Sequence, residues 1–350
     1  MGEHEANLLA HRDISVDNLR ALAVLFMILV HAAATWMPST ASKTSLIAYV
    51  VAGIGGLAAP LFVTLFGWGI AASTSLTGKK VLQRAGILAL CQLAVNFAAP
   101  HLFDPLTPGV LTLFSLLYLT APLWNKLSDA PKVEFFTLVS FLVLPFFLIE
   151  FMGPSSWTSR IETTTVSTLV AHLFLTGQYP LFPWLVFALL GAHLYRQPTR
   201  SLSHTTLLVG SFLISLSTIW YAADQNRPWA LATDPSNTAV LTFFPATTTF
   251  LFAAVLGVLL LWFACYQRFE SNLFVPLGQM SLSIYVIHFI PIGLFHEALS
   301  SQSNKLLHYA VIVLYTFLWI PLARLWLARF PNQTIESLFR RRQSNSSSDE

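Results

Sequence analysis

Long apolar runs are the feature of this sequence that most constrains its fold. A helix that crosses a bilayer needs roughly 20 mostly apolar residues, because it must satisfy its own backbone hydrogen bonds where water is absent. About ten stretches of this 350-residue chain reach that length. Only 10% of the residues are charged, against about 25% in soluble domains. We therefore expect an all-α, polytopic integral membrane helical bundle.

The predicted spans cover 18–36, 54–76, 84–100, 108–125, 133–152, 180–196, 204–222, 238–265, 275–296 and 306–328. The stretch VSTLVAHLFLTGQ at 166–178 is too short to span and is expected to be interfacial or re-entrant. We expect one membrane domain at 18–328, preceded by a cytoplasmic segment at 1–17. The polar, charged residues 329–350 are expected to form a disordered cytoplasmic tail.

The basic residues predict the orientation. With a cytoplasmic N-terminus, all but four of the 19 lysines and arginines lie on the inner side. The exceptions are Lys43, Arg160, Arg227 and Lys305. Cytoplasmic loops carry an excess of basic residues, so both termini are expected in the cytoplasm, with 101–107 and 153–165 outside. The net charge of +3 then reflects topology rather than nucleic-acid binding.

The first span, NLRALAVLFMILVHAA, carries two ionisable residues, Arg20 and His31. Their separation of eleven residues places His31 roughly 16 Å deeper than Arg20, on nearly the same helix face and close to the bilayer midplane. Ionisable groups at that depth are costly and usually functional. The structural alternative is that Arg20 reaches lipid headgroups while His31 makes an interhelical hydrogen bond.

A second histidine has the same predicted depth. In LGQMSLSIYVIHFIPIGLF, the same arithmetic places His288 level with His31, and Tyr285 lies one turn earlier on the same face. Two histidines at one depth predict a single polar chamber in the bundle.

Further polar residues mark the third and fifth predicted spans. Asn96 follows Gln92 by one helical turn, and His101 and Asp104 come after it on the outer side. Their structural alternatives are interhelical hydrogen bonding and an ordinary polar loop. Glu150, near the outer end of its span, is either an acceptor-side residue or an interfacial charge.

Five motifs occur in an order that resembles a known family. They are ISVDNLRALAVLFMILVH, APLFVTLFGWGIA, YPLFPWLVFALLGAHLYR, FFPATTTFLFAAVLG and LGQMSLSIYVIH. Together they resemble bacterial membrane proteins related to heparan-alpha-glucosaminide N-acetyltransferase. The spacing of Arg20 and His31 is similar to that in the wider acyltransferase family 3, whose members O-acylate cell-envelope glycans. The resemblance spans roughly residues 12–328.

The resemblance implies an enzyme of the bacterial inner (plasma) membrane. It would move an acetyl or other acyl group from cytoplasmic acyl-CoA to a sugar amine or hydroxyl of a glycan or glycolipid on the far side. Arg20 and His31 match the family's paired arginine and histidine. The lysosomal animal enzymes hold asparagine where His31 stands and place their active histidine later, whereas 32–50 here contain no histidine. That departure leaves N- versus O-acylation open.

This chemistry assigns roles to the candidate residues. His31 is expected to be a neutral general base, or to be acylated itself. The candidates for oxyanion stabilisation are Tyr285, His288 and Asn96. The nucleotide phosphates of acyl-CoA would meet basic residues of the inner rim, namely Arg20, Lys79, Lys80, Arg84 and Arg268. The expected acceptor-side residues are His101, Asp104 and Glu150, and no metal is expected.

Two other functions fit parts of the pattern. A proton-coupled transporter or flippase of a lipid-linked or small polar solute would use the histidines as a proton relay. The sequence shows no internal repeat of the kind common in transporters and few intramembrane carboxylates, which argues against it. A third reading is a structural or assembly subunit without catalysis.

Overall fold

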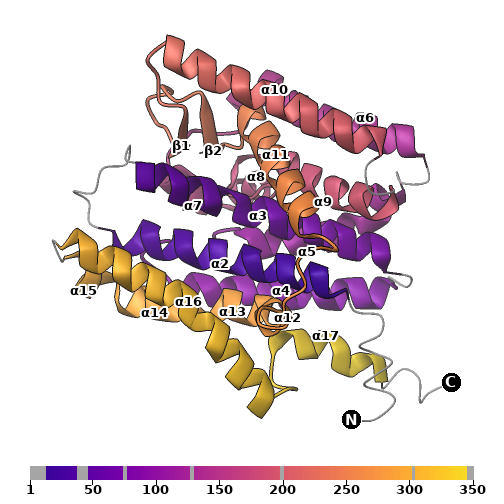
Figure 1. Ribbon diagram of the computed structural model, residues 1–350, viewed down its shortest axis with the longest axis vertical. Coiled ribbons are helices and arrows are strands. Elements are labelled where there is room, and N and C mark those ends of the chain that lie inside the picture. The colour runs from indigo at the N-terminus through magenta and orange to yellow at the C-terminus, as the bar shows by residue number, and fades with distance from the viewer. Residues whose placement is uncertain are drawn as a thin grey trace.

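The computed structural model is a bundle of long helices with a small strand pair at one end (Figure 1). It describes residues 13–37, 46–73, 77–126, 130–197, 201–301 and 304–344. Most of the expected N-terminal segment and the last six residues of the expected tail lie outside this described part, as do Arg12, Lys43 and Arg200.

The elements follow the apolar runs closely. The helices of the first half are α2 (Ile14–Trp36), α3 (Leu46–Ala72), α4 (Gly78–Ala98), α5 (Val110–Trp124), α6 (Pro131–Leu148) with the turn η2 (Ile149–Phe151), α7 (Thr158–Ile161), and α8 (Val166–Ala171) with η3 (His172–Thr176). The second half holds α9 (Leu181–Arg196), α10 (Leu202–Asp224), β1 (Ala230–Thr233), β2 (Leu241–Phe244), α11 (Thr248–Cys265), α12 (Val275–Gln279), α13 (Ser281–Ile287), α14 (Phe289–Leu294), α15 (His296–Ser300), α16 (Lys305–Arg329) and α17 (Ile335–Ser344). The two strands pair in parallel, with Ala230 opposite Leu241.

Seven of the described helices are long and apolar enough to cross a membrane, against the prediction of about ten spans. They are α2, α3, α4, α6 with η2, α10, α11 and α16. The number rises to eight if Val166–Thr176 and Leu181–Arg196, bent by 41°, form one broken span rather than a re-entrant loop. The remaining predicted spans correspond to the shorter apolar helices Val110–Trp124 and Ser281–Leu294.

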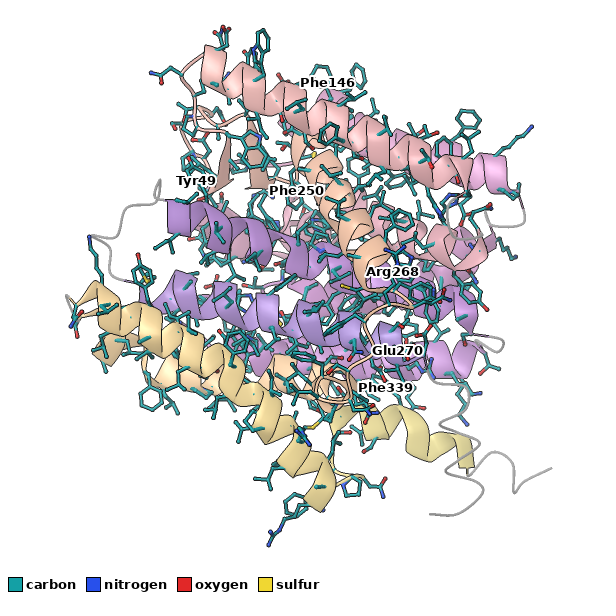
Figure 2. The ribbon with its side chains drawn as sticks, in the orientation of Figure 1. Tyr49, Phe146, Phe250, Arg268, Glu270 and Phe339 are labelled. Atoms are coloured by element: carbon teal, nitrogen blue, oxygen red, sulfur yellow. The ribbon has the colours of Figure 1, made fainter. Side chains whose placement is uncertain are left out.

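The outward faces of these helices carry large exposed apolar side chains. Phe146 of α6 is 69% exposed and points away from the bundle (Figure 2), and Trp220 of α10 and Leu314 of α16 are similarly exposed. A soluble protein rarely exposes apolar surface on this scale. These faces suit contact with lipid, and the fold is that of an integral membrane protein.

The centre of the bundle depends on a close crossing of α3 and α9. A Cβ atom added at Gly67 would lie 2.1 Å from the carbonyl oxygen of Ala188, and one at Gly191 would lie 1.8 Å from that of Thr64. Small residues allow two backbones to approach this closely in a membrane, where dispersion contacts drive helix association. Beside the crossing lie the fully buried rings of Trp184 and Phe187.

A buried ion-pair cluster joins α6, α9 and α10. Glu134 accepts a hydrogen bond from Arg196 at 2.8 Å and lies 3.3 Å from His193 Nδ1. His193 Nε2 lies 2.8 Å from Ser203 Oγ. Arg196 also donates to the side chain of Asn125. Burial of Glu134 is tolerated because its carboxylate has two basic partners.

The predicted span at 238–265 is wrong in its first ten residues. Strand β2 ends at Phe244, and α11 begins only at Thr248, after Thr247 Oγ1 caps it by accepting from the amide of Phe250. Pro245 has no backbone N–H and lies between the strand and the helix, where no helical hydrogen bond requires one. Its carbonyl accepts from Thr242 Oγ1.

The predicted span at 275–296 is divided into α12, α13 and α14. Gly278 in α12 packs directly on the backbone of α2, where an added Cβ would lie 2.0 Å from the Asp17 carbonyl oxygen. The break between α13 and α14 falls at His288.

The tail is not wholly disordered, as was expected from residue 329, because α17 forms within it. The Glu336 carboxylate of α17 accepts from the amides of Leu282 and Ser283 and from Ser283 Oγ. These long-range bonds cap the start of α13. Composition alone does not reveal such a partner.

The start of α2 and the helix α17 lie at one end of the bundle (Figure 1). Arg268, Glu270 and Phe339 of α17 all lie toward this end, whereas Tyr49 lies at the opposite end (Figure 2). This arrangement suits a chain whose two ends share one side of the membrane. That the shared side is the cytoplasm stays a prediction.

We expect an impermeant thiol reagent to label Thr164→Cys from outside intact cells and Lys126→Cys only after permeabilisation. Both positions are exposed and belong to opposite sides of the predicted topology. The parent should lack Cys91 and Cys265, which are free thiols. The reverse labelling pattern would show that the orientation is inverted.

Candidate active site

Two histidines from distant parts of the chain form the centre of the candidate site. His31 lies on α2 and His288 at the junction of α13 and α14. His31 Nδ1 lies 2.9 Å from His288 Nε2, and the rings are inclined by only 13°. The polar chamber predicted from matched depths therefore brings these residues into direct contact.

The hydrogen bonds of His288 determine how the pair shares its protons. His288 Nδ1 lies 2.7 Å from the Tyr285 carbonyl oxygen and 3.1 Å from that of Ile284. Carbonyl oxygens only accept, so Nδ1 carries a proton, and in a neutral ring Nε2 is then an acceptor. His31 Nδ1 must donate to it. A neutral His31 is thereby left with an unprotonated Nε2, the atom that a general base needs.

The backbone around this pair is fixed by a second contact. Tyr315 of α16 donates its hydroxyl to the His288 carbonyl oxygen at 2.6 Å. The ring of Phe289 packs 4.8 Å from that of His31. Both contacts hold the imidazoles in place, and the pair itself is contributed by helices from the two ends of the sequence.

A cavity of about 70 Å³ adjoins His31. This is about half the roughly 150 Å³ of an engineered lysozyme cavity that binds benzene, so the space suits a group of a few atoms. The lining residues are His31, Ala34, Thr35, Gln92, Leu102, Phe103, Gly109, Trp157, Gln178, Tyr179 and Tyr285. Of the predicted catalytic residues, His31 and Tyr285 line this cavity directly.

Two loops that are predicted to lie outside pack against each other beside the cavity. Trp157 Nε1 donates to the Leu102 carbonyl oxygen at 3.2 Å, and Thr107 Oγ1 donates to that of Ile161 at 2.8 Å. Both loops also contribute cavity residues, Phe103 and Trp157 among them. This boundary of the site is thus built from the segments that the predicted topology places outside.

Asn96 is not brought to the histidines. Its amide nitrogen donates to the carbonyl oxygens of Pro105 and Thr107, at 3.0 and 2.9 Å, and its oxygen accepts from Gln92. Gln92 lies nearer the cavity, and its oxygen accepts from the amide of Leu111. These bonds tie α4 to the start of α5, which is the structural alternative that the sequence left open.

The predicted donor-side residues lie apart along the inner end. Arg20 pairs with Asp17 at 2.9 Å, and Arg84 lies between two aromatic rings, 5.8 Å from Tyr118 and 5.9 Å from Phe339. Lys79, Lys80 and Arg268 are exposed or half-buried. The structure thus offers basic groups at that end but no single preformed cluster among the described residues.

The predicted acceptor-side residues also differ in setting. His101 stacks on His296 with ring centroids 4.4 Å apart. Burial, and then the neighbouring His296, lower the pKa of His101. Asp104 is half-buried in the loop before α5, whereas Glu150 is exposed in η2. None of the three lines the cavity.

The sequence did not indicate several lining residues, of which Gln178, Trp157 and Thr35 are polar. Thr35 follows His31 by one helical turn, a signal that the spacing does contain. Gln178 and Trp157 come from the outer segments, whose approach to α2 depends on long-range packing. Within the described residues, no group of three or more His, Cys, Asp or Glu side chains could hold a metal ion.

Comparison with known families agrees with this fold. An acyltransferase domain, that of acyltransferase family 3, matches residues 13–325, which is most of the chain. No curated protein matches the sequence. The match confirms the wider of the two predicted resemblances, and the apolar helices fit the same conclusion. The chain belongs to acyltransferase family 3 and is a membrane acyltransferase.

Proposed function

We propose that the protein transfers an acyl group from cytoplasmic acyl-CoA to a sugar hydroxyl or amine of an envelope glycan or glycolipid on the far side of the membrane. The observation that carries the proposal is the hydrogen bonding of the histidine pair, which leaves His31 Nε2 free to accept a proton beside a small cavity. The five sequence motifs that resemble the heparan-alpha-glucosaminide N-acetyltransferase relatives favour a sugar acceptor.

In the proposed reaction, the acceptor oxygen or nitrogen attacks the thioester carbonyl carbon while His31 Nε2 takes the proton of that oxygen or nitrogen. The carbonyl electron pair moves onto its oxygen, and the hydroxyl of Tyr285, a residue that lines the same cavity, donates a hydrogen bond to that oxygen. Collapse of this intermediate breaks the C–S bond. The CoA thiolate leaves and receives the proton held by His31.

His288 acts in this scheme as a positioning residue. Its Nε2 accepts from His31 Nδ1 and thereby holds the His31 ring in the tautomer that exposes Nε2. The Tyr285 and Ile284 carbonyls in turn hold His288. Positive charge that develops on His31 would be shared along this chain of hydrogen bonds.

The depth of the histidine pair determines where the donor and the acceptor would meet. His31 lies eleven residues beyond Arg20, roughly 16 Å along α2 from the inner end. A thioester arm entering from that end and a sugar group entering beneath the outer loops would meet at the cavity. Neither whole substrate then has to cross the membrane. Trp157 and Phe103, which line the outer side of the cavity, offer aromatic faces to a sugar ring.

Arg84→Ala should raise the apparent KM for acetyl-CoA about tenfold or more with little change in kcat, the effect of one lost phosphate contact. The reason is that an arginine between Tyr118 and Phe339 presents a fixed guanidinium at the inner end. The wild-type affinity should also fall as salt rises. Steady-state release of CoA thiol by the purified protein measures both.

Lys126→Ala is the matched control, because Lys126 is an exposed inner basic residue outside the proposed donor site. It should keep the wild-type KM. An Arg84→Ala protein with wild-type KM would show that Arg84 serves topology and packing alone. A wild-type protein that releases no CoA from acetyl-CoA, with or without membrane glycans added, would remove the proposed function itself.

A further inference from the structure

A glutamine in the cavity wall has an unused hydrogen-bond donor. Gln178 is only 2% exposed, and its amide nitrogen has no partner among the described residues. A buried amide left unpaired costs about 1–3 kcal/mol. Native proteins rarely tolerate that cost unless a water, an ion or a substrate completes the bond.

The backbone that carries Gln178 is firmly held. Arg160, itself 1% exposed, uses all five of its N–H donors on carbonyl oxygens, those of Met152, Gly153, Pro154, Thr176 and Gly177. The last two belong to the residues just before Gln178. Burial lowers the pKa of Arg160 to about 10, which still leaves it charged at neutral pH. The Arg160 cage therefore fixes Gln178 relative to the outer loop.

Two other polar side chains of the lining already have or can reach partners. Gln92 bonds both Leu111 and Asn96 through its amide. Thr35 Oγ1 is unpartnered, but a threonine hydroxyl on a helix can turn to the carbonyl four residues back. Gln178 thus keeps a buried amide donor without an acceptor, and it lines the same small cavity as His31.

We infer that Gln178 is a catalytic residue that donates a hydrogen bond to the acyl carbonyl oxygen as that oxygen becomes negative during transfer. This inference rests on the proposed function and deepens it. A second donor beside Tyr285 completes a pair of the kind that stabilises tetrahedral oxyanions in acyl transfer, and the Arg160 cage holds it in place before the substrate arrives.

The decisive variant is Gln178→Met, which keeps the length of the side chain and removes the donor. We expect kcat for CoA release from acetyl-CoA to fall roughly 100- to 1,000-fold, with KM within about twofold of wild type. The position of the inflection in the pH–rate profile should not move, because an amide does not titrate. The melting temperature in detergent should stay equal or rise, since an unpaired buried amide gives way to an apolar group.

Gln92→Met is the matched control, since Gln92 is equally buried in the same wall but bonded at both ends of its amide. It should lower the melting temperature. Lower activity together with unchanged or higher stability is expected only of Gln178.

A Gln178→Met protein with wild-type kcat, or one that melts earlier as Gln92→Met does, would overturn the inference. Comparison with His31→Gln separates a failure of the role of Gln178 from a failure of the role of His31. If His31→Gln is inactive while Gln178→Met is fully active, only the role of Gln178 fails. If both variants keep wild-type activity, the role of His31 as the base fails as well, whereas only a wild-type protein that releases no CoA from acetyl-CoA would remove the proposed function.

Discussion

His31→Gln is expected to lower acyl transfer by a factor of roughly 100 or more, the scale of a lost general base. Glutamine can still donate a hydrogen bond to His288 Nε2, but its amide takes up no proton at neutral pH. Expression, melting temperature and CoA binding should therefore stay near wild type. Release of CoA thiol from acetyl-CoA, measured alongside thermal melting in detergent, tests all of these together.

His204→Gln provides a comparison of the same chemical change. His204 is a buried histidine of α10 beside His193, in the cluster that joins α6, α9 and α10 rather than at the cavity. Its substitution should leave transfer near wild type. Full activity of His31→Gln would instead make His31 a structural hydrogen-bonding residue, and the chemistry would have to be sought at His288 or His101.

Arg160→Met is expected to have the largest effect on stability. The change leaves five backbone carbonyls without their donor, and the bonds to Met152 and Gly177 are fully buried. Each buried carbonyl left unpaired costs about 1–3 kcal/mol, so those two alone predict a loss of about 2–6 kcal/mol. The melting temperature should fall by several degrees, and activity should fall with it because Gln178 loses its support.

Arg227→Met tests whether the burial of the Arg160 hydrogen bonds causes the expected loss of stability. Arg227 also donates to two backbone carbonyls, those of Asn237 and Thr238, but at exposed positions where water can replace it. Its substitution should change stability by less than about 1 kcal/mol. The loss of stability in Arg160→Lys should lie between those of Arg160→Met and Arg227→Met. The reason is that the lysine ammonium offers only three donors to the five carbonyl acceptors. Equal melting of Arg160→Met and wild type would refute the structural role of the cage.

The arrangement of the spans and of the histidine pair was largely predictable from the sequence. A run of apolar residues determines a membrane helix locally, and a rise of about 1.5 Å per residue then gives the depth of each polar group. His31 and His288 could be matched this way because both lie well inside their apolar runs, although α13 and α14 meet at His288. The same arithmetic could not say which ring nitrogen donates, since that depends on the Tyr285 and Ile284 carbonyls.

The errors occurred where long-range contacts decide the structure. Residues 238–247 were predicted to belong to a membrane span because β2 owes its form to pairing with β1 rather than to its own apolar residues. The residues of α17 were predicted to be disordered because their partner, the start of α13, is more than fifty residues away in the sequence. The hydrogen bonds of Asn96 to the backbone of the next loop could not be predicted from its spacing to Gln92.

Gln178 was missed for a related reason. It lies at the end of a segment too short to span, and its importance depends on the Arg160 cage and on the loops folded above the cavity. A polar residue at a loop is unremarkable until the structure shows that it is buried and unpaired.

Acyl transfer across the membrane through His31 is tested most directly by the side of the membrane from which the donor acts. Vesicles of the expressing cells are prepared inside-out and right-side-out, and radiolabelled acetyl-CoA is added only to the external solution. We expect acetyl incorporation into the glycan or glycolipid fraction of inside-out vesicles. No incorporation is expected in intact right-side-out vesicles or in inside-out vesicles that carry His31→Gln. Equal incorporation from both sides, or incorporation that persists in His31→Gln, would contradict transfer across the membrane through His31.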